Sequence, residues 1–309
     1  MADSFLNTST QRYALVTGAN GGIGFEICKQ LASRGIMVVL TDKDEQKCIE
    51  AQERLKEFGF SDRFVFHQLD VVDSNSITSI YDFIKSKFGR LDILVNNAGV
   101  SGIARVEGDP LIVEELILAS LSDEPQGDGA KANGSVIQTY EGAQECLQTN
   151  YYGANRTTEA LIPLLKLSDS PRIVNISSSL GLLKVFSSEW VKRVLSDPEN
   201  LTEEKIDEVV KNFLKSFKEG SLEGDGWPTQ LSSYKVSKAA LSAYTRLMAR
   251  KYPSFRINCV CPGFVRTNIT CNQGFLSADE AAEAPVKLAL VPHGGPSGLF
   301  FRRFKVSPF

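Results

Sequence analysis

The chain has 309 residues, of which 42% are hydrophobic and 23% are charged, and its formal net charge is −3. This composition is typical of one large α/β domain with a full core, and the slight acidity argues against nucleic acid or an acidic membrane as a partner. The polar stretch from Met1 to Gln11 lacks the apolar core of a secretory signal, and no apolar run is long enough to span a bilayer.

Apolar, β-branched runs alternate with amphipathic segments along the chain. We expect strands at 13–17, 36–41, 63–69, 92–96, 172–177 and 255–260, with a short strand near 298–301. We expect helices at 22–34, 44–58, 74–88, about 141–166 and 232–251. This alternation predicts α/β architecture, with one Rossmann-type doubly wound parallel sheet and helices on both faces, in a single domain over 1–309. Ligands of such sheets bind at the carboxyl ends of the strands.

A glycine-rich turn follows the first expected strand, with the sequence Thr17-Gly18-Ala19-Asn20-Gly21-Gly22-Ile23-Gly24. Glycines between a strand and a helix bring backbone N–H groups close to a pyrophosphate at the positive end of the helix. A glycine-rich turn without a ligand is the alternative, which the alternating series of strands and helices disfavours.

Tyr234 and Lys238 stand four residues apart on an expected helix and therefore share one face. An ammonium beside a phenol can lower the phenol's pKa of about 10, which makes the phenol usable as a proton donor and acceptor near neutral pH. Alone, this pattern is typical of any amphipathic helix.

Five motifs in order carry a family resemblance. The glycine turn is followed by Asn96-Asn97-Ala98-Gly99, by Ser178 after a strand, by the Tyr234 and Lys238 pair and by Pro262-Gly263. This series, over about 12–267, resembles the short-chain dehydrogenase/reductase family. The phrases Gly24-Phe25-Glu26-Ile27-Cys28, Phe66-His67-Gln68-Leu69-Asp70 and Gly295-Pro296-Ser297-Gly298 resemble, more narrowly, the plant menthone, neomenthol and salutaridine reductases.

The resemblance implies catalytic roles for four residues. Tyr234 would be the acid in ketone reduction and the base in alcohol oxidation, and Lys238 would lower its pKa and hydrogen-bond the nicotinamide ribose. Ser178 would orient the substrate oxygen. Asn150 would hold a water for proton relay to the lysine, although without the resemblance it is more readily interpreted as a polar residue of a helix.

The end of the second expected strand is diagnostic of the cofactor. Asp42 lies 18 residues past Gly24, near the spacing of about 20 for the acid that binds the ribose. A carboxylate there favours NAD, as does Gly21, where NADP-dependent relatives often carry a basic residue. Lys43 points the other way, towards NADP, because it is basic at a position where NADP-dependent relatives carry Arg. We expect NAD and leave NADP open.

Further residues are expected at the cofactor from their motif positions. Asn97 should hold strand ends together at the cofactor's edge, Asp70 should meet the adenine, and Thr267 should contact the nicotinamide amide. The complete expected set is Gly18, Asn20, Gly21, Gly22, Ile23, Gly24, Asp42, Lys43, Asp70, Val71, Asn97, Tyr234, Lys238, Pro262, Gly263, Val265 and Thr267.

Two stretches, about 102–140 and 180–230, exceed the compact plan of the family and are expected to form a substrate flap. The first holds a polar loop from Ser122 to Ser135. The second holds an apolar stripe at helical spacing from Thr202 to Gly220. This helix either packs as a surface decoration or covers the substrate cleft, and its position between Ser178 and Tyr234 favours the cleft. In relatives the first insertion covers the helix face used for tetramer contacts, so the resemblance implies a monomer.

The six cysteines include no CxxC pair, and only two histidines, His67 and His293, are present. We therefore expect no metal, reduced thiols and a cytoplasmic protein. The expected function is an NAD(P)-dependent oxidoreductase that interconverts a secondary alcohol and a small apolar ketone, with a cyclic monoterpenoid of the menthone, neomenthol or borneol type as the leading substrate. The alternatives are an alkaloid ketone, an enone C=C bond, and a non-catalytic dinucleotide-binding module.

Overall fold

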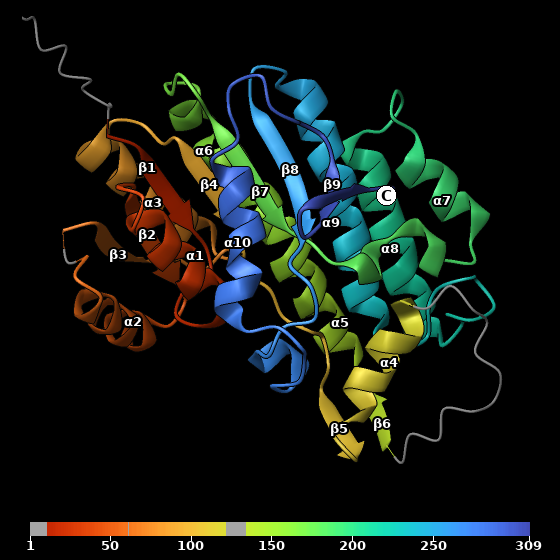
Figure 1. Cartoon of the computed structure of the whole chain (residues 1–309). Coiled ribbons are helices and arrows are strands. Elements are labelled where there is room, and N and C mark those ends of the chain that lie inside the picture. The colour runs from red at the N-terminus through yellow and green to blue at the C-terminus, as the bar shows by residue number, and fades with distance from the viewer. Residues whose placement is uncertain (1–10, 61, 122–133) are drawn as a thin grey trace, which may run out of the picture.

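The computed structural model describes residues 11–60, 62–121 and 134–309. Its central sheet contains β1 (Tyr13–Val16), β2 (Met37–Asp42), β3 (Phe64–Gln68), β4 (Ile93–Asn96), β7 (Arg172–Ile176), β8 (Arg256–Cys261), β9 (Phe300–Arg302) and β10 (Lys305–Ser307). The strand order is β10-β9-β8-β7-β4-β1-β2-β3, and every pair is parallel except β9 with β10 (Figure 1). The order reverses between β1 and β4, which confirms the predicted doubly wound sheet and places a binding crevice at the carboxyl ends of these strands.

Helices cover both faces of the sheet. The helical segments are α1 (Gly22–Ala32), α2 (Glu45–Glu57), α3 (Ser74–Phe88), α4 (Ile112–Leu121), α5 (Tyr140–Leu147), the π-helix η1 (Gln148–Gly153), α6 (Ala154–Leu165), the short 3₁₀ turns η2 (Ser179–Gly181), η3 (Leu183–Val185) and η4 (Asn268–Thr270), α7 (Glu189–Ser196), α8 (Glu203–Glu219), α9 (Ser232–Lys251) and α10 (Ala278–Ala289). Among the described segments, no helix is both long enough and apolar enough to cross a bilayer.

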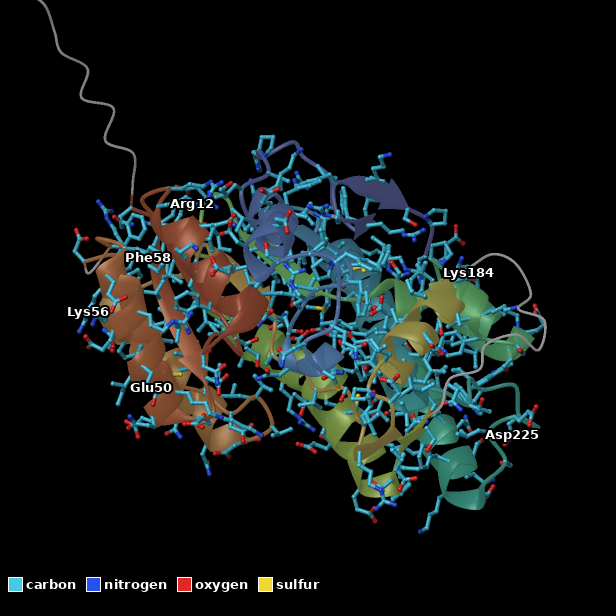
Figure 2. The ribbon with its side chains drawn as sticks, turned by 60° about the horizontal axis from the view of Figure 1, so that its bottom comes forward. Arg12, Glu50, Lys56, Phe58, Lys184 and Asp225 are labelled. Carbon is cyan, nitrogen blue, oxygen red and sulfur yellow. The ribbon has the colours of Figure 1, made fainter. Side chains whose placement is uncertain are left out.

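Two hydrophobic cores lie on opposite faces of the sheet because side chains alternate along each strand. On β1, Leu15 belongs to the core under α3, α5, α6 and α9. Its neighbours Ala14 and Val16 belong to the core under α1, α2 and α10. Figure 2 shows Glu50 and Lys56 on the outer side of α2, with Asp225, in the loop after α8, at the opposite end of the molecule.

A buried network of hydrogen bonds joins α9 to the middle of the sheet. Asn96 on β4 donates from Nδ2 to Thr158 Oγ1 at 2.9 Å and to Asn175 Oδ1 at 2.8 Å. Asn175 on β7 donates in turn to Thr245 Oγ1 on α9 at 2.8 Å. All four side chains are buried. Because an unpaired polar group is costly in such a place, the network fixes how α9 lies on β4 and β7.

The two insertions were both expected to form a substrate flap, and the structure bears this out for the first insertion but not for the helix of the second. The apolar stripe of α8, including Val210 and Phe213, is buried in the core shared with α9, and α8 packs against α5, α7 and α9. No residue of α8 lines the cavity that contains Ser178 and Tyr234, so the prediction that this helix covers the cleft is wrong. Instead α4, from the first insertion, contributes Val113 and Ile117 to that cavity.

The first insertion was expected to cover the helix face that relatives use for tetramer contacts. In this structure α8, from the second insertion, lies on α5 and α9. Tyr151 Oη donates to Asp207 Oδ1 at 3.1 Å, which fastens α8 to η1. In the first insertion, β5 (Arg105–Gly108) and β6 (Gly134–Ile137) form a small antiparallel pair that projects away from the main sheet (Figure 1). Of the expected polar loop, 122–133 lie outside the described residues, and Ser135 belongs to β6.

The expected strands and the helix ranges first assigned are confirmed, with ends that differ by at most two residues. The range 141–166 is divided by η1 into α5, a π-turn and α6. Several elements were not predicted: β5, β6, β10, α4, α7 and α10. For α10, Pro285 and many alanines obscure the helical pattern, although the capping box of Ser277 and Glu280 marks its start.

We predict that Asn175→Ala lowers the free energy of unfolding by about 1–3 kcal/mol, because it removes partners from the buried groups of Asn96 and Thr245. Urea unfolding followed by circular dichroism measures this change. Asn212→Ala, which removes an exposed amide on α8, is the matched control and should change stability by less than about 0.5 kcal/mol. Equal stability of the two variants would show that the network does not hold α9 in place.

Candidate active site

Two neighbouring cavities open at the carboxyl end of the sheet. The first, here the glycine-side cavity, has a volume of about 450 Å³ and is lined by the glycine turn, Asp42 and Asn97. The second, the tyrosine-side cavity, has a volume of about 490 Å³ and is lined by Ser178, Tyr234 and apolar side chains. Ile269 lines both cavities, so a ligand in one lies beside a ligand in the other.

Tyr234 and Lys238 lie on the same face of α9, next to the end of β7. Lys238 Nζ donates to the backbone oxygen of Ile176 at 2.8 Å and lies 5.5 Å from the centre of the Tyr234 ring. Ser178, two residues after Ile176, shares the tyrosine-side cavity with Tyr234, and its hydroxyl interacts with the phenol. The three predicted catalytic groups are therefore brought together although the chain separates them.

A close contact of Gly181 holds Ser178 at this place. Ser178 Oγ accepts a hydrogen bond from Leu180 N at 3.2 Å and thereby caps the short turn η2. A Cβ on Gly181 would lie 2.6 Å from the backbone of both Lys238 and Ala239, so only glycine allows the turn to rest directly on α9. The turn after β7 is thus pressed against the helix that carries the catalytic pair.

Burial sets the protonation state of the pair. Removal from water raises the pKa of Tyr234 well above its usual range, with the nearby Cys261 and Cys146 acting in the same direction and Ser178 partly opposing them. Burial lowers the pKa of Lys238 to about 8. Burial therefore outweighs the lowering of the Tyr234 pKa that was expected from Lys238. The phenol is neutral and holds its proton at neutral pH.

Asn150 lies in η1, where the helix widens to π geometry, a feature often found at functional sites. Its amide is fully engaged with the loop after β4, because Oδ1 accepts from Val100 N at 2.8 Å and Nδ2 donates to Val100 O at 2.9 Å. Nδ2 also donates to Ser237 Oγ at 3.0 Å. A Cβ on Gly99 would lie 3.2 Å from Asn150 Oδ1 and 3.6 Å from Lys238 Nζ, so amide and ammonium converge on the same glycine.

The glycine turn is held against the end of β4. Asn97 Nδ2 donates to Thr17 O at 2.9 Å and to Gly18 O at 2.8 Å, which is the strand-tying role expected for this residue. Gly18 adopts φ +62°, and a Cβ there would lie 2.7 Å from Ala98 Cα. Only glycine therefore permits this close approach. The helix α1 begins after Gly21 without a capping side chain, so backbone N–H groups of its first turn remain available to a ligand.

Asp42 and Thr267 both line the glycine-side cavity. Asp42, at the end of β2, is half-buried, and burial raises the pKa of its carboxyl group. Its Oδ1 accepts from Asp44 N at 3.1 Å, which leaves the other oxygen for a ligand. Lys43 is exposed beside it. Thr267 faces the turn, since a Cβ on Gly22 would lie 3.4 Å from Thr267 Cγ2.

The structure groups most of the predicted cofactor residues. Those that line the glycine-side cavity are Gly18, Asn20, Gly21, Gly22, Ile23, Gly24, Asp42, Lys43, Asp70, Val71, Asn97 and Thr267. Gly263 lines the tyrosine-side cavity instead, and the buried Pro262 and Val265 line neither. Tyr234 lines only the tyrosine-side cavity, and the buried Lys238 lines neither.

Sequence reasoning missed several residues that line or hold the site. Arg266 and Glu145 line the glycine-side cavity, but neither belongs to a motif used above. Gln138 accepts from Ser232 N at 2.7 Å and donates to Thr229 O at 2.9 Å, which joins the first insertion to the start of α9. In the described part of the chain, no three His, Cys, Asp or Glu side chains gather as metal ligands do.

Comparison with known proteins agrees with this geometry. Residues 12–115 match the family described as short chain dehydrogenase, and residues 220–293 match one described as Enoyl-(Acyl carrier protein) reductase. The chain is 54% identical to (+)-neomenthol dehydrogenase of Capsicum annuum over 98% of this chain and 99% of that protein. It is 57% identical to (−)-isopiperitenone reductase of Mentha piperita over 96% and 97% of the two chains.

A solved structure supports the same relation. Menthone neomenthol reductase from Mentha piperita superimposes with a TM-score of 0.86 at 54% identity, over 96% of this chain and 100% of that chain. The chain belongs to the short-chain dehydrogenase/reductase family and is an oxidoreductase that binds NAD or NADP.

Proposed function

We propose that the protein interconverts a cyclic monoterpenoid secondary alcohol and its ketone, with NAD as the preferred cofactor. The observation that carries the proposal is the placement of Tyr234 and Ser178 in the wall of an apolar cavity that adjoins the glycine-side cavity. The remaining walls include Ile117, Leu231 and Phe264, which suit a hydrocarbon ring. The names of the neomenthol and isopiperitenone relatives point to the same substrate class.

The glycine-side cavity fits a dinucleotide. The uncapped start of α1 suits a pyrophosphate, and Asp42 suits a ribose hydroxyl. When bound, the nicotinamide exchanges a hydride with the substrate carbon. The protein's own task is to hold the substrate oxygen and to move one proton.

The neutral phenol of Tyr234 is suited to donate its proton to the carbonyl oxygen, while Ser178 Oγ donates a hydrogen bond to the same oxygen. Because the pKa of Lys238 is about 8, its ammonium is mostly charged at pH 7, and a positive charge beside the phenol stabilises the phenolate formed after transfer. In the reverse direction Tyr234 acts as the base. Asn150, whose side chain is bonded to Val100 in the loop after β4, has the proposed role of holding a water that relays the proton to Lys238.

The preference for NAD is supported by the half-buried carboxylate of Asp42, which would repel a 2′-phosphate. The nearby cations Lys43 and Arg266 are both exposed and therefore more strongly screened.

Carbonyl chemistry is favoured over C=C reduction because a proton donor, Tyr234, stands beside the hydroxyl of Ser178 that would hold the oxygen. We further propose a cytoplasmic monomer, since five of the six cysteines are buried and none is disulfide-bonded, and α8 lies over α5 and α9.

The proposal predicts turnover of menthone, neomenthol or borneol, with the alcohol or ketone identified by gas chromatography after incubation with each cofactor. Tyr234→Phe should retain cofactor binding and lose about 10²–10⁴-fold in kcat, because the proton donor is gone. Tyr81→Phe, which removes a hydroxyl on α3 outside both cavities, is the matched control. Full activity of Tyr234→Phe, or saturation of a C=C bond in an enone substrate, would contradict the proposal.

Cofactor choice is tested by titrating the protein with NAD and NADP and following intrinsic fluorescence. We expect tighter binding of NAD, and Asp42→Ala should weaken NAD binding by about tenfold or more because a hydrogen bond to a charged acceptor is lost. The same variant should bind NADP more tightly than the unaltered protein. Asp82→Ala, which removes an exposed carboxylate on α3, should leave both affinities unchanged. If the unaltered protein binds NADP more tightly than NAD, the preference is wrong.

A further inference from the structure

The tyrosine-side cavity has an unbalanced positive charge on one side. Its lining includes Arg302, Arg303 and Lys305 from the β9–β10 turn, together with Phe304, and no Asp or Glu among the described residues. A neutral hydrocarbon ketone needs only the apolar walls and the polar pair at the carbonyl. The three cations therefore have no role in the reaction as described so far.

Arg302 and Lys305 form an unfavourable pair in the free protein. They are direct cross-strand partners in the antiparallel register of β9 and β10. Like charges directly opposite each other destabilise a sheet. Within the described chain, neither side chain has a carboxylate within ion-pair distance, and neither donates a side-chain hydrogen bond. An anion between them would relieve the repulsion.

Arg303 is hydrogen-bonded to other parts of the chain and, as a third cation, does not neutralise Arg302 and Lys305. Its backbone N donates to Cys261 O at 2.9 Å, which fixes the turn against the end of β8. Its Nη2 donates to Glu280 O at 3.4 Å. The carboxylate of Glu280 already accepts from Ser277, and hydrogen bonds from Ser277 and the charge of Arg303 together lower its pKa. Arg302 and Lys305 line the cavity, and neither has an ion-pair partner among the residues that the structure describes.

The distance to the catalytic pair follows from the sheet. Ser178 follows β7, and Arg302 ends β9, which lies two strands away. With a spacing of about 4.8 Å between strands, the two positions are roughly 10 Å apart. Val113 and Ile117 of α4 and Leu180 line the same cavity.

We propose that Arg302 and Lys305 form an anion subsite that selects apolar ketones or alcohols carrying a carboxylate roughly 10 Å from the reacting carbon. This inference rests on the proposed alcohol and ketone chemistry and extends its substrate class from neutral terpenoids to apolar oxo acids and hydroxy acids. The carbonyl meets Ser178 and Tyr234, the hydrocarbon part lies along α4, and the carboxylate lies between the two cations.

A matched pair of substrates tests the subsite. The linear keto acid 9-oxodecanoate and its methyl ester share a skeleton and differ in the charge at the far end. We expect a roughly tenfold higher kcat/KM for the acid at low salt, an advantage that Arg302→Gln with Lys305→Gln removes and that high salt reduces. Lys287→Gln is the control, because Lys287 lies 5.5 Å from the Phe304 ring but does not line the cavity, so the advantage should persist.

Binding without turnover separates this inference from the proposed function. Isothermal titration calorimetry of the NAD-loaded protein with octanoate and with octanol compares an anionic and a neutral chain of equal length. Tighter binding of octanoate, lost in the double variant, supports the subsite even if no ketone is turned over. Equal binding of both chains, or an equal acid-to-ester ratio in the unaltered protein and the double variant, overturns it.

Discussion

A buried ammonium beside a buried phenol is the constraint on which the site depends. Lys238 is almost completely removed from water, and in the described structure its charge is met by the backbone oxygen of Ile176. That contact requires the end of β7 and one face of α9 to stay in register within hydrogen-bonding distance. The contact of Gly181 with α9 and the buried amides of Asn96 and Asn175 maintain this register. Residues that line neither cavity therefore position the phenol and the ammonium.

The two insertions add different parts to the central sheet and its helices. The first supplies α4 as a wall of the tyrosine-side cavity, and Gln138 anchors its end to the start of α9. The second supplies α8, which buries its apolar stripe on α5 and α9 and supports the catalytic helix from behind. One insertion thus shapes the cavity, and the other covers a surface that would otherwise expose hydrophobic side chains.

The doubly wound sheet and the proximity of Tyr234 to Lys238 could be predicted from the sequence because each has a local signal. The strands have apolar runs, the turn has glycines, and Tyr234 and Lys238 have helical spacing. The partner of α8 could not be predicted, since an amphipathic stripe shows that a face is buried but not which neighbour buries it. The direction of the Tyr234 pKa shift was mispredicted for a similar reason. The spacing reveals the nearby ammonium, but the burial that outweighs the effect of this charge arises only in the folded chain.

Arg302 and Lys305 show the same limit, because they belong to no motif and become neighbours at the cavity only when β9 and β10 pair.

The central claim is that desolvation keeps the proton on Tyr234. NMR with ring-labelled tyrosine, in which Tyr234→Phe identifies the signal, measures it directly in cofactor-free protein. The account predicts a neutral phenol signal that persists beyond pH 10. A phenolate signal that grows as the pH passes through neutrality would contradict it.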